Sequence, residues 1–414
     1  MRTVTVWPRS IEEFRGIVDD DVIADVAGLG AKNEGLKVLH INSTEYGGGV
    51  AEVLLAQIPV LEDLGVAARW GVIDGDEQFF EITKSIHNGF QGDKSIPWEP
   101  KMEVHYLHNV GLNLESLPDG FDVCVVHDPQ PMAIPHLLGE DRFRIAKKWI
   151  WRCHIDCADP HPQIWNFVGQ FLDPYDAMVF TMKEYVQPDV EADKVVISPP
   201  SIDPTSPKNS HLERVTVNDL CRQYHIDVKR PIMVQVSRFD PWKDPQGVIR
   251  AYKIVKERVP DVQLILAGSL AHDDPEGLKI YDELVRERGD DQDLLILSNF
   301  QQVGNTTINA FQRAADVLIQ KSIKEGFGLT VSEAAWKGKP VIGGRAGGIT
   351  LQIEDARTGY LVDSVEECAE RSLELLANPD RAQTMGDAAR ELVREKFLTT
   401  RELTDWLKLF VDLA

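Results

Sequence analysis

One segment, residues 324–340 (KEGFGLTVSEAAWKGKP), holds two carboxylates with seven residues between them. Glu325 lies in a glycine-flanked loop, and Glu333 follows on the first turns of a helix expected to begin near Thr330. The loop glycines allow a ligand to approach the backbone closely, and the first N–H groups of a helix attract an anion. This order suits a sugar nucleotide, in which hydroxyl-rich rings flank a pyrophosphate. The alternative is a plain helix start, with Thr330 as cap and Glu333 completing a capping box.

Two cations lie on one short loop in residues 237–244 (SRFDPWKD), directly after the apolar run PIMVQV. Arg238 offers a planar fork of donors and Lys243 a point charge, two complementary ways of holding a pyrophosphate. In a chain this acidic, two neighbouring cations at a strand end indicate an anion site. The alternative is a solvated turn with an ordinary salt bridge.

Three consecutive glycines occur in residues 43–52 (STEYGGGVAE), between an apolar run and a helical pattern. A strand-to-helix turn of this kind lets a phosphate or a hydroxyl approach the backbone at the start of a helix. A tight turn without a ligand explains the same glycines, so this motif alone decides nothing.

Two further apolar runs end in a histidine and an aspartate. The first is VHDPQP, with His127 and Asp128, and the second is WRCHID, with His154 and Asp156. A histidine at the end of a strand is either a hydrogen-bonded core residue or a ligand-binding group. We expect His154, flanked by charged residues, to belong to the site, and we leave both readings open for His127.

The elements that must position these groups alternate between short apolar runs and longer amphipathic stretches. Expected strands are KVLHIN, FDVCVVH, WIWRCH, DAMVF, PIMVQVS, VQLILAGS, LLILSNF, DVLIQKS and PVIGG, and expected helices include AEVLLAQIPVLEDLG and the last 14 residues. Continuous apolar runs are typical of parallel strands covered on both faces. The sequence therefore predicts a doubly wound α/β architecture.

Residues 198–208 (SPPSIDPTSPK) interrupt this alternation, because four prolines disfavour both helix and strand. We predict a hinge there between two Rossmann-like domains that face each other across a cleft. The predicted N-terminal domain, residues 1–203, binds the acceptor, and the domain of residues 204–395 binds the nucleotide sugar. Residues 396–414 are expected to form a helix that packs back on the N-terminal domain.

Composition narrows the class of protein. A formal net charge of −22 argues against sequence-independent binding to nucleic acid or to anionic lipid. No apolar run reaches the length of a membrane span, and the N-terminus lacks an apolar signal core, so we expect a cytoplasmic protein.

Three other kinds of site are disfavoured. Cys153 and Cys157 bracket His154, but no second ligand pair follows at a suitable spacing for a metal ion. No P-loop occurs, since Gly338 and Lys339 are followed by proline, and the glycines near the N-terminus lack the dinucleotide fingerprint.

These motifs resemble the retaining nucleotide-sugar glycosyltransferases of the glycosyltransferase-B fold, the group of glycogen and sucrose synthases. Glu325 and Glu333 match that group's paired glutamates, and Arg238 with Lys243 match its phosphate-binding pair. HINSTEYGGGVAEVL, VHDPQP, WRCHID, VQVSRFDPWKD, AHDDPEG and EGFGLTVSEAAWKGKPVIG together resemble the trehalose glycosyltransferring synthases. Retaining trehalose phosphorylases of the same fold share much of this set.

The resemblance implies a role for each matching residue. The catalytic residues would be His154, Arg238, Lys243 and Glu325. The donor would contact Arg238, Lys243, Gly326, Phe327, Gly328, Leu329, Thr330, Glu333, Gly48 and Gly49, and the acceptor would contact Asp128, Asp156 and Gly48. No metal ligand is implied.

The expected reaction is the reversible formation of α,α-trehalose from a nucleoside diphosphate glucose and free glucose, with retention of configuration. The co-substrate would be ADP-, UDP- or GDP-glucose, no cofactor would be bound covalently, and any Mg²⁺ would act through the nucleotide phosphates. The resemblance also implies a homodimer. Two alternatives stay open: a phosphorylase that cleaves trehalose with phosphate, and a non-catalytic sugar sensor.

Overall fold

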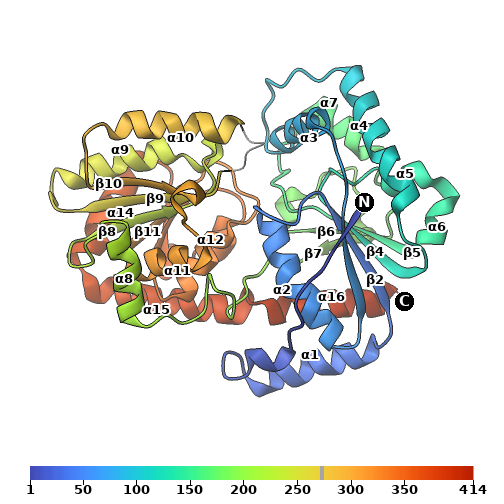
Figure 1. Ribbon diagram of the computed structural model, residues 1–414, viewed down its shortest axis with the longest axis horizontal. Helices are drawn as coiled ribbons and strands as arrows, with labels where there is room; N and C mark the ends of the chain where they lie inside the picture. Colours follow the sequence, from blue (N-terminus) through green and yellow to red (C-terminus); the bar gives the residue numbers. More distant parts are fainter. Residues whose placement is uncertain (271–274, 414) are drawn as a thin grey trace. The chain divides into compact units, whose positions relative to one another are not determined.

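The computed structural model describes residues 1–270 and 275–413, which form two compact units. The first unit contains Met1–Ser201 and the C-terminal segment from Thr399, and the second contains Ile202–Leu398. Each unit is a parallel sheet with helices on both faces (Figure 1). The doubly wound α/β architecture expected from the apolar runs is confirmed. Of the resemblance motif AHDDPEG, the first four residues lie outside the described residues.

The first sheet has seven strands in the order β1-β3-β2-β4-β5-β6-β7. Its strands are β1 (Arg2–Val4), β2 (Lys37–Asn42), β3 (Ala67–Val72), β4 (Phe121–His127), β5 (Ala146–Arg152), β6 (Ala177–Phe180) and β7 (Val195–Ile197). All neighbours pair in parallel except the edge strand β1, which runs antiparallel to β3. The chain winds outward in one direction from β2 and in the other from β4. The loops after β2 and β4 therefore flank the switch point, where open α/β sheets bind ligands.

The helices of the first unit lie in two layers. One layer holds α1 (Asp20–Lys32), α2 (Gly49–Asp63) and α16 (Thr399–Leu413), and the other holds α3 (Glu77–Phe90), α4 (Pro100–Asn113) and α7 (Pro162–Gly169). The short helices α5 (Ile134–Leu138) and α6 (Arg142–Ile145) follow β4. The C-terminal helix α16 packs against α1 and α2, and the Asn33 side chain donates a hydrogen bond to the Leu407 carbonyl at 3.0 Å.

The second sheet has six parallel strands in the order β10-β9-β8-β11-β12-β13. Its strands are β8 (Ile232–Val236), β9 (Gln263–Gly268), β10 (Leu294–Ser298), β11 (Val317–Gln320), β12 (Val341–Gly344) and β13 (Gly359–Val362). The winding reverses between β8 and β11. The loops after these two strands, residues 237–244 and 321–328, therefore flank the second switch point.

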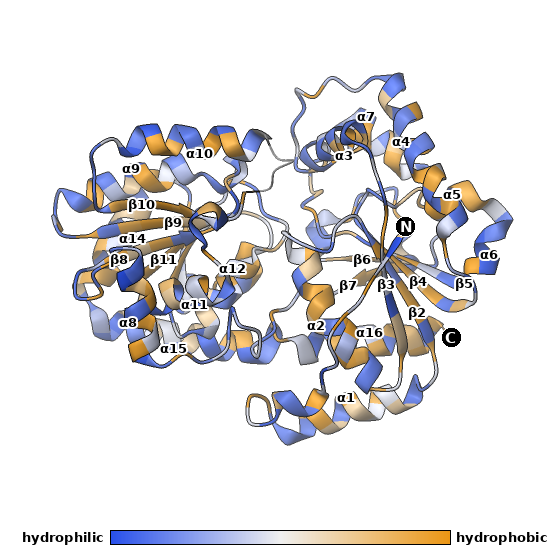
Figure 2. Ribbon diagram, in the orientation of Figure 1, coloured by the Kyte–Doolittle hydropathy of each residue, from blue (hydrophilic) through white to orange (hydrophobic). Residues whose placement is uncertain are grey.

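Helices cover both faces of the second sheet. They are α8 (Arg214–Gln223), α9 (Pro245–Lys256), α10 (Pro275–Arg288), α11 (Asn305–Ala314), α12 (Leu329–Trp336), α13 (Ile349–Gln352), α14 (Val365–Ala377) and α15 (Pro379–Lys396). Alternate residues of β8 point to opposite faces. Met233 packs in a core with α9, α10 and α14, whereas Ile232 and Val234 pack in a second core with α8, α11 and α12. The strands are accordingly apolar on both faces and the helices on one (Figure 2).

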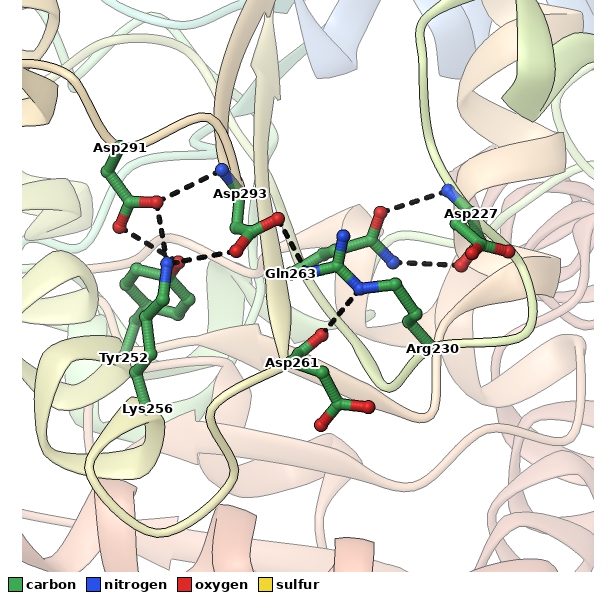
Figure 3. Close-up of polar contacts among 8 residues, drawn as sticks. All are labelled: Asp227, Arg230, Tyr252, Lys256, Asp261, Gln263, Asp291 and Asp293. Atoms are coloured by element: carbon green, nitrogen blue, oxygen red, sulfur yellow. Dashed lines mark hydrogen bonds and ion pairs between the residues drawn. The ribbon is translucent and has the colours of Figure 1, made fainter.

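A network of charged side chains fixes the loops at the amino edge of this second sheet (Figure 3). Lys256 on α9 contacts the carboxylates of Asp291 at 2.6 Å and Asp293 at 3.1 Å, and Arg230 contacts Asp293 from the other side at 2.5 Å. These hydrogen bonds raise the pKa of Lys256 against the opposing effect of burial. The network lies at the opposite edge of the strands from the switch-point loops.

Several details differ from the sequence prediction. The second unit begins at Ile202 and ends at Leu398, rather than at residues 204 and 395, because these two residues pair in a parallel bridge. Strand β5 ends at Arg152, so His154 follows the strand instead of ending it. Asn299 to Gln301 form a 3-10 turn, where a strand was expected. Strands β1, β3, β7 and β13 were not predicted.

No helix in residues 1–270 or 275–413 has the length and apolarity needed to cross a membrane.

Candidate active site

The loop after β8 carries Arg238 and Lys243 and ends in a defined turn. Asp244 adopts a left-handed conformation (φ 46°), and its carboxylate accepts the N–H of Gly247 at 3.0 Å, which caps α9. The amide of Gln235, within β8, donates to the Lys243 carbonyl at 2.8 Å. The backbone of Lys243 is therefore held from the strand and from the helix.

Lys243 and Glu325, 82 residues apart in the chain, meet at the second switch point. Lys243 Nζ lies 2.7 Å from Glu325 Oε2, and the two side chains are only 13% and 9% exposed. The Ser322 hydroxyl donates to the same carboxylate oxygen at 3.1 Å, and the N–H of Ile323 donates to the Trp242 carbonyl at 2.8 Å. The two loops that the sequence analysis singled out thus form one site.

Helix α12 begins with no side-chain cap. Its N-cap is Gly328 in a left-handed conformation (φ 85°), and Thr330 Oγ1 donates to Gln320 at 3.1 Å. The alternative of a Thr330 cap with a Glu333 capping box is therefore wrong. Gln352 donates to the Phe327 carbonyl at 2.6 Å, which fixes the loop from α13. The first N–H groups of α12 have no acceptor within the helix, and this end of the helix favours an anion.

Arg238 is more exposed than Lys243, with 40% of its side chain accessible, and lies 3.2 Å from the Asp240 carboxylate. Asp240 is buried and also accepts the N–H of Trp242 at 2.8 Å. The aspartate therefore orients the guanidinium while it shapes the loop.

Glu333 is the fifth residue of α12 and is only 1% exposed. Its carboxylate pairs with Lys208 at 3.0 Å, and Gln312 donates to it at 3.5 Å. Lys337, one turn further on, donates to the Glu333 carbonyl at 3.0 Å; burial lowers the pKa of Lys337 to about 7. The structure thus gives Glu333 a lysine partner that the motif did not reveal.

In the first unit, the glycine cluster forms the start of α2. Gly47 has φ 80°, Gly48 is the N-cap in extended backbone, and Gly49 is the first helical residue. A Cβ atom added at Gly47 or Gly48 would meet no protein atom within 4 Å. Internal packing therefore does not require a glycine at Gly48, and space is left beside the backbone there.

Asp128 follows β4 in a left-handed conformation (φ 62°), which is uncommon outside glycine. Its carboxylate accepts the backbone N–H of His154 at 2.8 Å, so the ends of β4 and β5 are linked. Burial raises the pKa of Asp128 to about 7, although this hydrogen bond and the charge of Arg152 act in the opposite direction. Asp156 is buried in the next turn and accepts the N–H of Ala158 at 3.1 Å.

Beside these residues lies a row of three histidines, of which His40 and His127 are buried and His154 is half-buried. His127 is 2% exposed, and its two ring nitrogens lie 3.0 Å from those of His40 and His154. Arg152 is fully buried beside them, and within the described part of the chain none of its side-chain nitrogens has a hydrogen-bond partner. The reading of His127 as a hydrogen-bonded core residue is therefore confirmed, and its role towards a ligand stays a prediction.

Cys153 and Cys157 place their sulfur atoms 3.9 Å apart, and both are buried. Within the described parts of the chain, no three His, Cys, Asp or Glu side chains gather in a way that could hold a metal ion.

The sequence analysis missed several residues that touch the site, namely His40, Lys208, Ser322, Asp240 and Gln352. His40 was visible as a polar residue in the middle of the apolar run KVLHIN. Lys208 gave no signal, because it lies in the proline-rich segment and reaches Glu333 only through the fold.

Two family models match the chain. The model described as "Trehalose synthase, N-terminal domain" matches residues 40–187, and that of "Glycosyl transferases group 1" matches residues 218–392. The trehalose synthase of Thermococcus litoralis is 45% identical over 97% of this chain and 96% of that protein. The trehalose synthase of Rubrobacter xylanophilus is 43% identical over 100% and 99%.

The chain belongs to the trehalose synthase family. It is accordingly an enzyme of the hexosyltransferase class, as the resemblance predicted. More distantly, the trehalose phosphorylase of Grifola frondosa is 28% identical over 97% of this chain and 60% of its own length.

Solved structures confirm that this family member has the glycosyltransferase-B fold. A sucrose-phosphate synthase from Thermosynechococcus elongatus superposes with a TM-score of 0.69 at 18% identity, covering 91% of this chain and 99% of that one. An Anabaena protein in complex with UDP-glucose gives a TM-score of 0.68 at 17% identity, with the same coverage.

Proposed function

We propose that the protein transfers glucose from a nucleoside diphosphate glucose to free glucose, with retention, and so forms α,α-trehalose reversibly. The observation that carries the proposal is the 2.7 Å contact between Lys243 and Glu325 at the second switch point. A cation for phosphate and a carboxylate for sugar hydroxyls stand there side by side, next to the uncapped start of α12. Relatives at 43–45% identity with the name trehalose synthase support the choice of acceptor and product.

In this proposal the second unit binds the donor. Arg238, Lys243 and the backbone of Gly326–Thr330 hold the pyrophosphate, Glu325 accepts hydroxyls of the donor glucose, and Glu333 binds the ribose. Lys208 neutralises Glu333, and the lone pairs that Lys208 and Gln312 leave free on the carboxylate accept the ribose hydroxyls in this proposal. The preserved charge of Lys243 stabilises the negative charge that grows on the leaving nucleotide.

The acceptor hydroxyl attacks from the face that the nucleotide leaves, through an oxocarbenium-like state. The leaving phosphate oxygen takes the proton of that hydroxyl, so no protein nucleophile is required. Retaining glycosidases instead use two carboxylates about 5 Å apart across the bond. Any Mg²⁺ would act through the donor phosphates in this scheme, as expected from the sequence.

The first unit supplies the other contacts. His154 lies against the donor sugar near the reacting carbon, Asp128 and Asp156 bind the acceptor, and Gly48 and Gly49 approach phosphate and acceptor. The space beside Gly48 supports this assignment, because a Cβ atom built there meets no atom of the described residues within 4 Å.

Product analysis by carbon-13 NMR tests the reaction. The protein is incubated with trehalose and ADP, UDP or GDP, and formation of an α-configured nucleoside diphosphate glucose is expected with one preferred base. A β-configured product would contradict retention. If trehalose does not react with any of the three nucleotides, free glucose is not the acceptor.

A phosphorylase is the second candidate, favoured by the 28% identical phosphorylase relative. Its signature is glucose 1-phosphate formed from trehalose and inorganic phosphate without any nucleotide. We expect no reaction when the protein is incubated with trehalose and inorganic phosphate alone. Formation of glucose 1-phosphate in that incubation would show that the protein is a phosphorylase and not a synthase.

The homodimer and the cytoplasmic location expected from the sequence remain part of this proposal. Light scattering coupled to size-exclusion chromatography should give twice the chain mass of 46.5 kDa. A measured mass equal to that of one chain would contradict the dimer.

A further inference from the structure

Three histidines from three neighbouring strands form one hydrogen-bonded row in the first unit. His40 Nδ1 lies 3.0 Å from His127 Nε2, and His127 Nδ1 lies 3.0 Å from His154 Nε2. The rings stack in sequence, with centroids 5.3 and 5.4 Å apart. His40, on β2, and His127, on β4, flank the switch point, and His154 follows β5.

Burial favours the neutral form of all three imidazoles. Burial lowers the pKa of His40 to about 3, and it lowers the pKa of His127 and His154 as well. The charge of the buried Arg152 acts on the pKa of His127 and His154 in the same direction. A neutral imidazole has one N–H and one bare nitrogen.

A row of neutral imidazoles allows only two proton orders, because His127 must donate on one side and accept on the other. In the first order every ring carries its proton on Nδ1, and His40 donates to His127, which donates to His154. In the second order every ring carries its proton on Nε2, and the donation runs the opposite way.

The surroundings of His40, at the buried end of the row, distinguish the two proton orders. His40 Nε2 is buried and has no hydrogen-bond partner among the described residues, so the second order would place an unpaired N–H donor there. The ring of Trp406 packs edge-on against His40, and its indole N–H is also buried without a partner. The second order would thus leave buried, unpaired N–H donors on two rings that pack against each other, and such groups are costly. The first order leaves only the indole N–H of Trp406 as an unpaired donor on these two rings.

We propose that His40 and His127 are positioning residues that hold His154 as the neutral Nδ1–H tautomer, so that His154 presents a hydrogen-bond donor to a sugar hydroxyl oxygen. The identity of the ligand as a sugar rests on the proposed function, whereas the tautomer of His154 does not. A ring held in this way cannot take the acceptor's proton at Nδ1, which agrees with proton transfer to the leaving phosphate.

Nitrogen-15 NMR of the full-length protein with labelled histidine rings tests the tautomer without substrate. The signals of His154 are assigned by their loss in His154→Gln. We expect Nδ1 protonated and Nε2 bare in the wild type, and the reverse would overturn the proposal.

Two variants of His127 test its part in the row. In His127→Asn the side-chain amide replaces the Nδ1–H donor, so the His154 tautomer should persist, with kcat/KM for nucleotide-dependent trehalose cleavage within about threefold of wild type. In His127→Leu the donor is lost, so His154 should shift toward Nε2–H and kcat/KM should fall about tenfold or more. Equal losses in both variants would show a merely structural role.

A matched control is His108→Leu, an exposed histidine on α4, which should change neither the His154 signals nor kcat/KM. If His127→Leu does not fold, the wild-type and His127→Asn spectra still decide the tautomer. If the protein cleaves no trehalose with any nucleotide, the proposed function fails while the tautomer result stands.

Discussion

The two sheets carry their candidate residues at equivalent places, the loops beside the switch point, yet the chemistry of the two places differs. In the second sheet the groups are charged and paired, as Lys243 with Glu325 and Lys321 with Asp244. In the first sheet they are neutral histidines and an aspartate whose pKa is raised to about 7.

The difference follows from what surrounds each edge. At the second sheet, Lys243 and Glu325 lie 2.7 Å apart, so each opposite charge compensates the other. At the end of β4 and β5, burial opposes charge on His127 and Asp128. One architecture thus offers a charged edge suited to a pyrophosphate and a neutral edge suited to sugar hydroxyls.

The largest expected effect comes from removing a cation of the charged edge. Lys243→Ala or Arg238→Ala should lower kcat about a hundredfold or more, because a donor to the leaving phosphate is lost. Steady-state turnover measures this, and Lys253→Ala on the exposed side of α9 is the control. Turnover within about threefold of wild type would show that Lys243 and Arg238 take no part in the reaction.

Gly48→Ala asks whether the open space in the first unit serves a ligand. We expect kcat/KM to fall about tenfold or more, since a methyl group would displace the bound substrate. The midpoint of urea unfolding should stay unchanged, because the new Cβ meets no protein atom within 4 Å. The control is Gly28→Ala on α1, where an added Cβ also meets no protein atom within 4 Å; it should lower neither kcat/KM nor the urea midpoint. Unchanged activity in Gly48→Ala would argue against ligand binding at Gly48.

Asp128→Asn tests the neutral edge through the pH dependence of stability. With a native pKa of about 7 against 3.8 for the free side chain, the folded protein binds a proton between pH 4 and 7 that the unfolded chain lacks. The free energy of unfolding therefore falls as pH rises through this window, by up to about 1.4 kcal/mol per pH unit from this group. Urea titrations across the window should show a shallower fall in the variant, and parallel curves would mean that Asp128 is ionised throughout. Asparagine is chosen because it tolerates the left-handed backbone.

The smallest effect on activity is expected at the amino edge of the second sheet. Lys256→Met removes the centre of the network with Asp291 and Asp293 and should cost about 1 kcal/mol of unfolding free energy. Turnover should stay within about twofold, because the network lies at the far end of the strands from Lys243. A large loss of turnover would show that this edge influences the site.

The sequence alone determined the doubly wound class, the motif residues and the strands other than β1, β3, β7 and β13. Continuous apolar runs such as KVLHIN and FDVCVVH have one physical solution, a strand covered on both faces, and β2 and β4 have the predicted bounds. The glycines and charges at the ends of these runs marked the loops that carry chemistry, including Arg238, Lys243 and Glu325.

Only the tertiary structure decided which of these loops meet. Strand order places β8 beside β11 and β2 beside β4, and local sequence does not encode which strands become neighbours. The same long-range packing gave Glu333 its partner Lys208 and aligned His40 behind His127. Hydrogen bonds and burial of this kind depend on residues many positions apart, so protonation states and partners emerge only when the chain has folded.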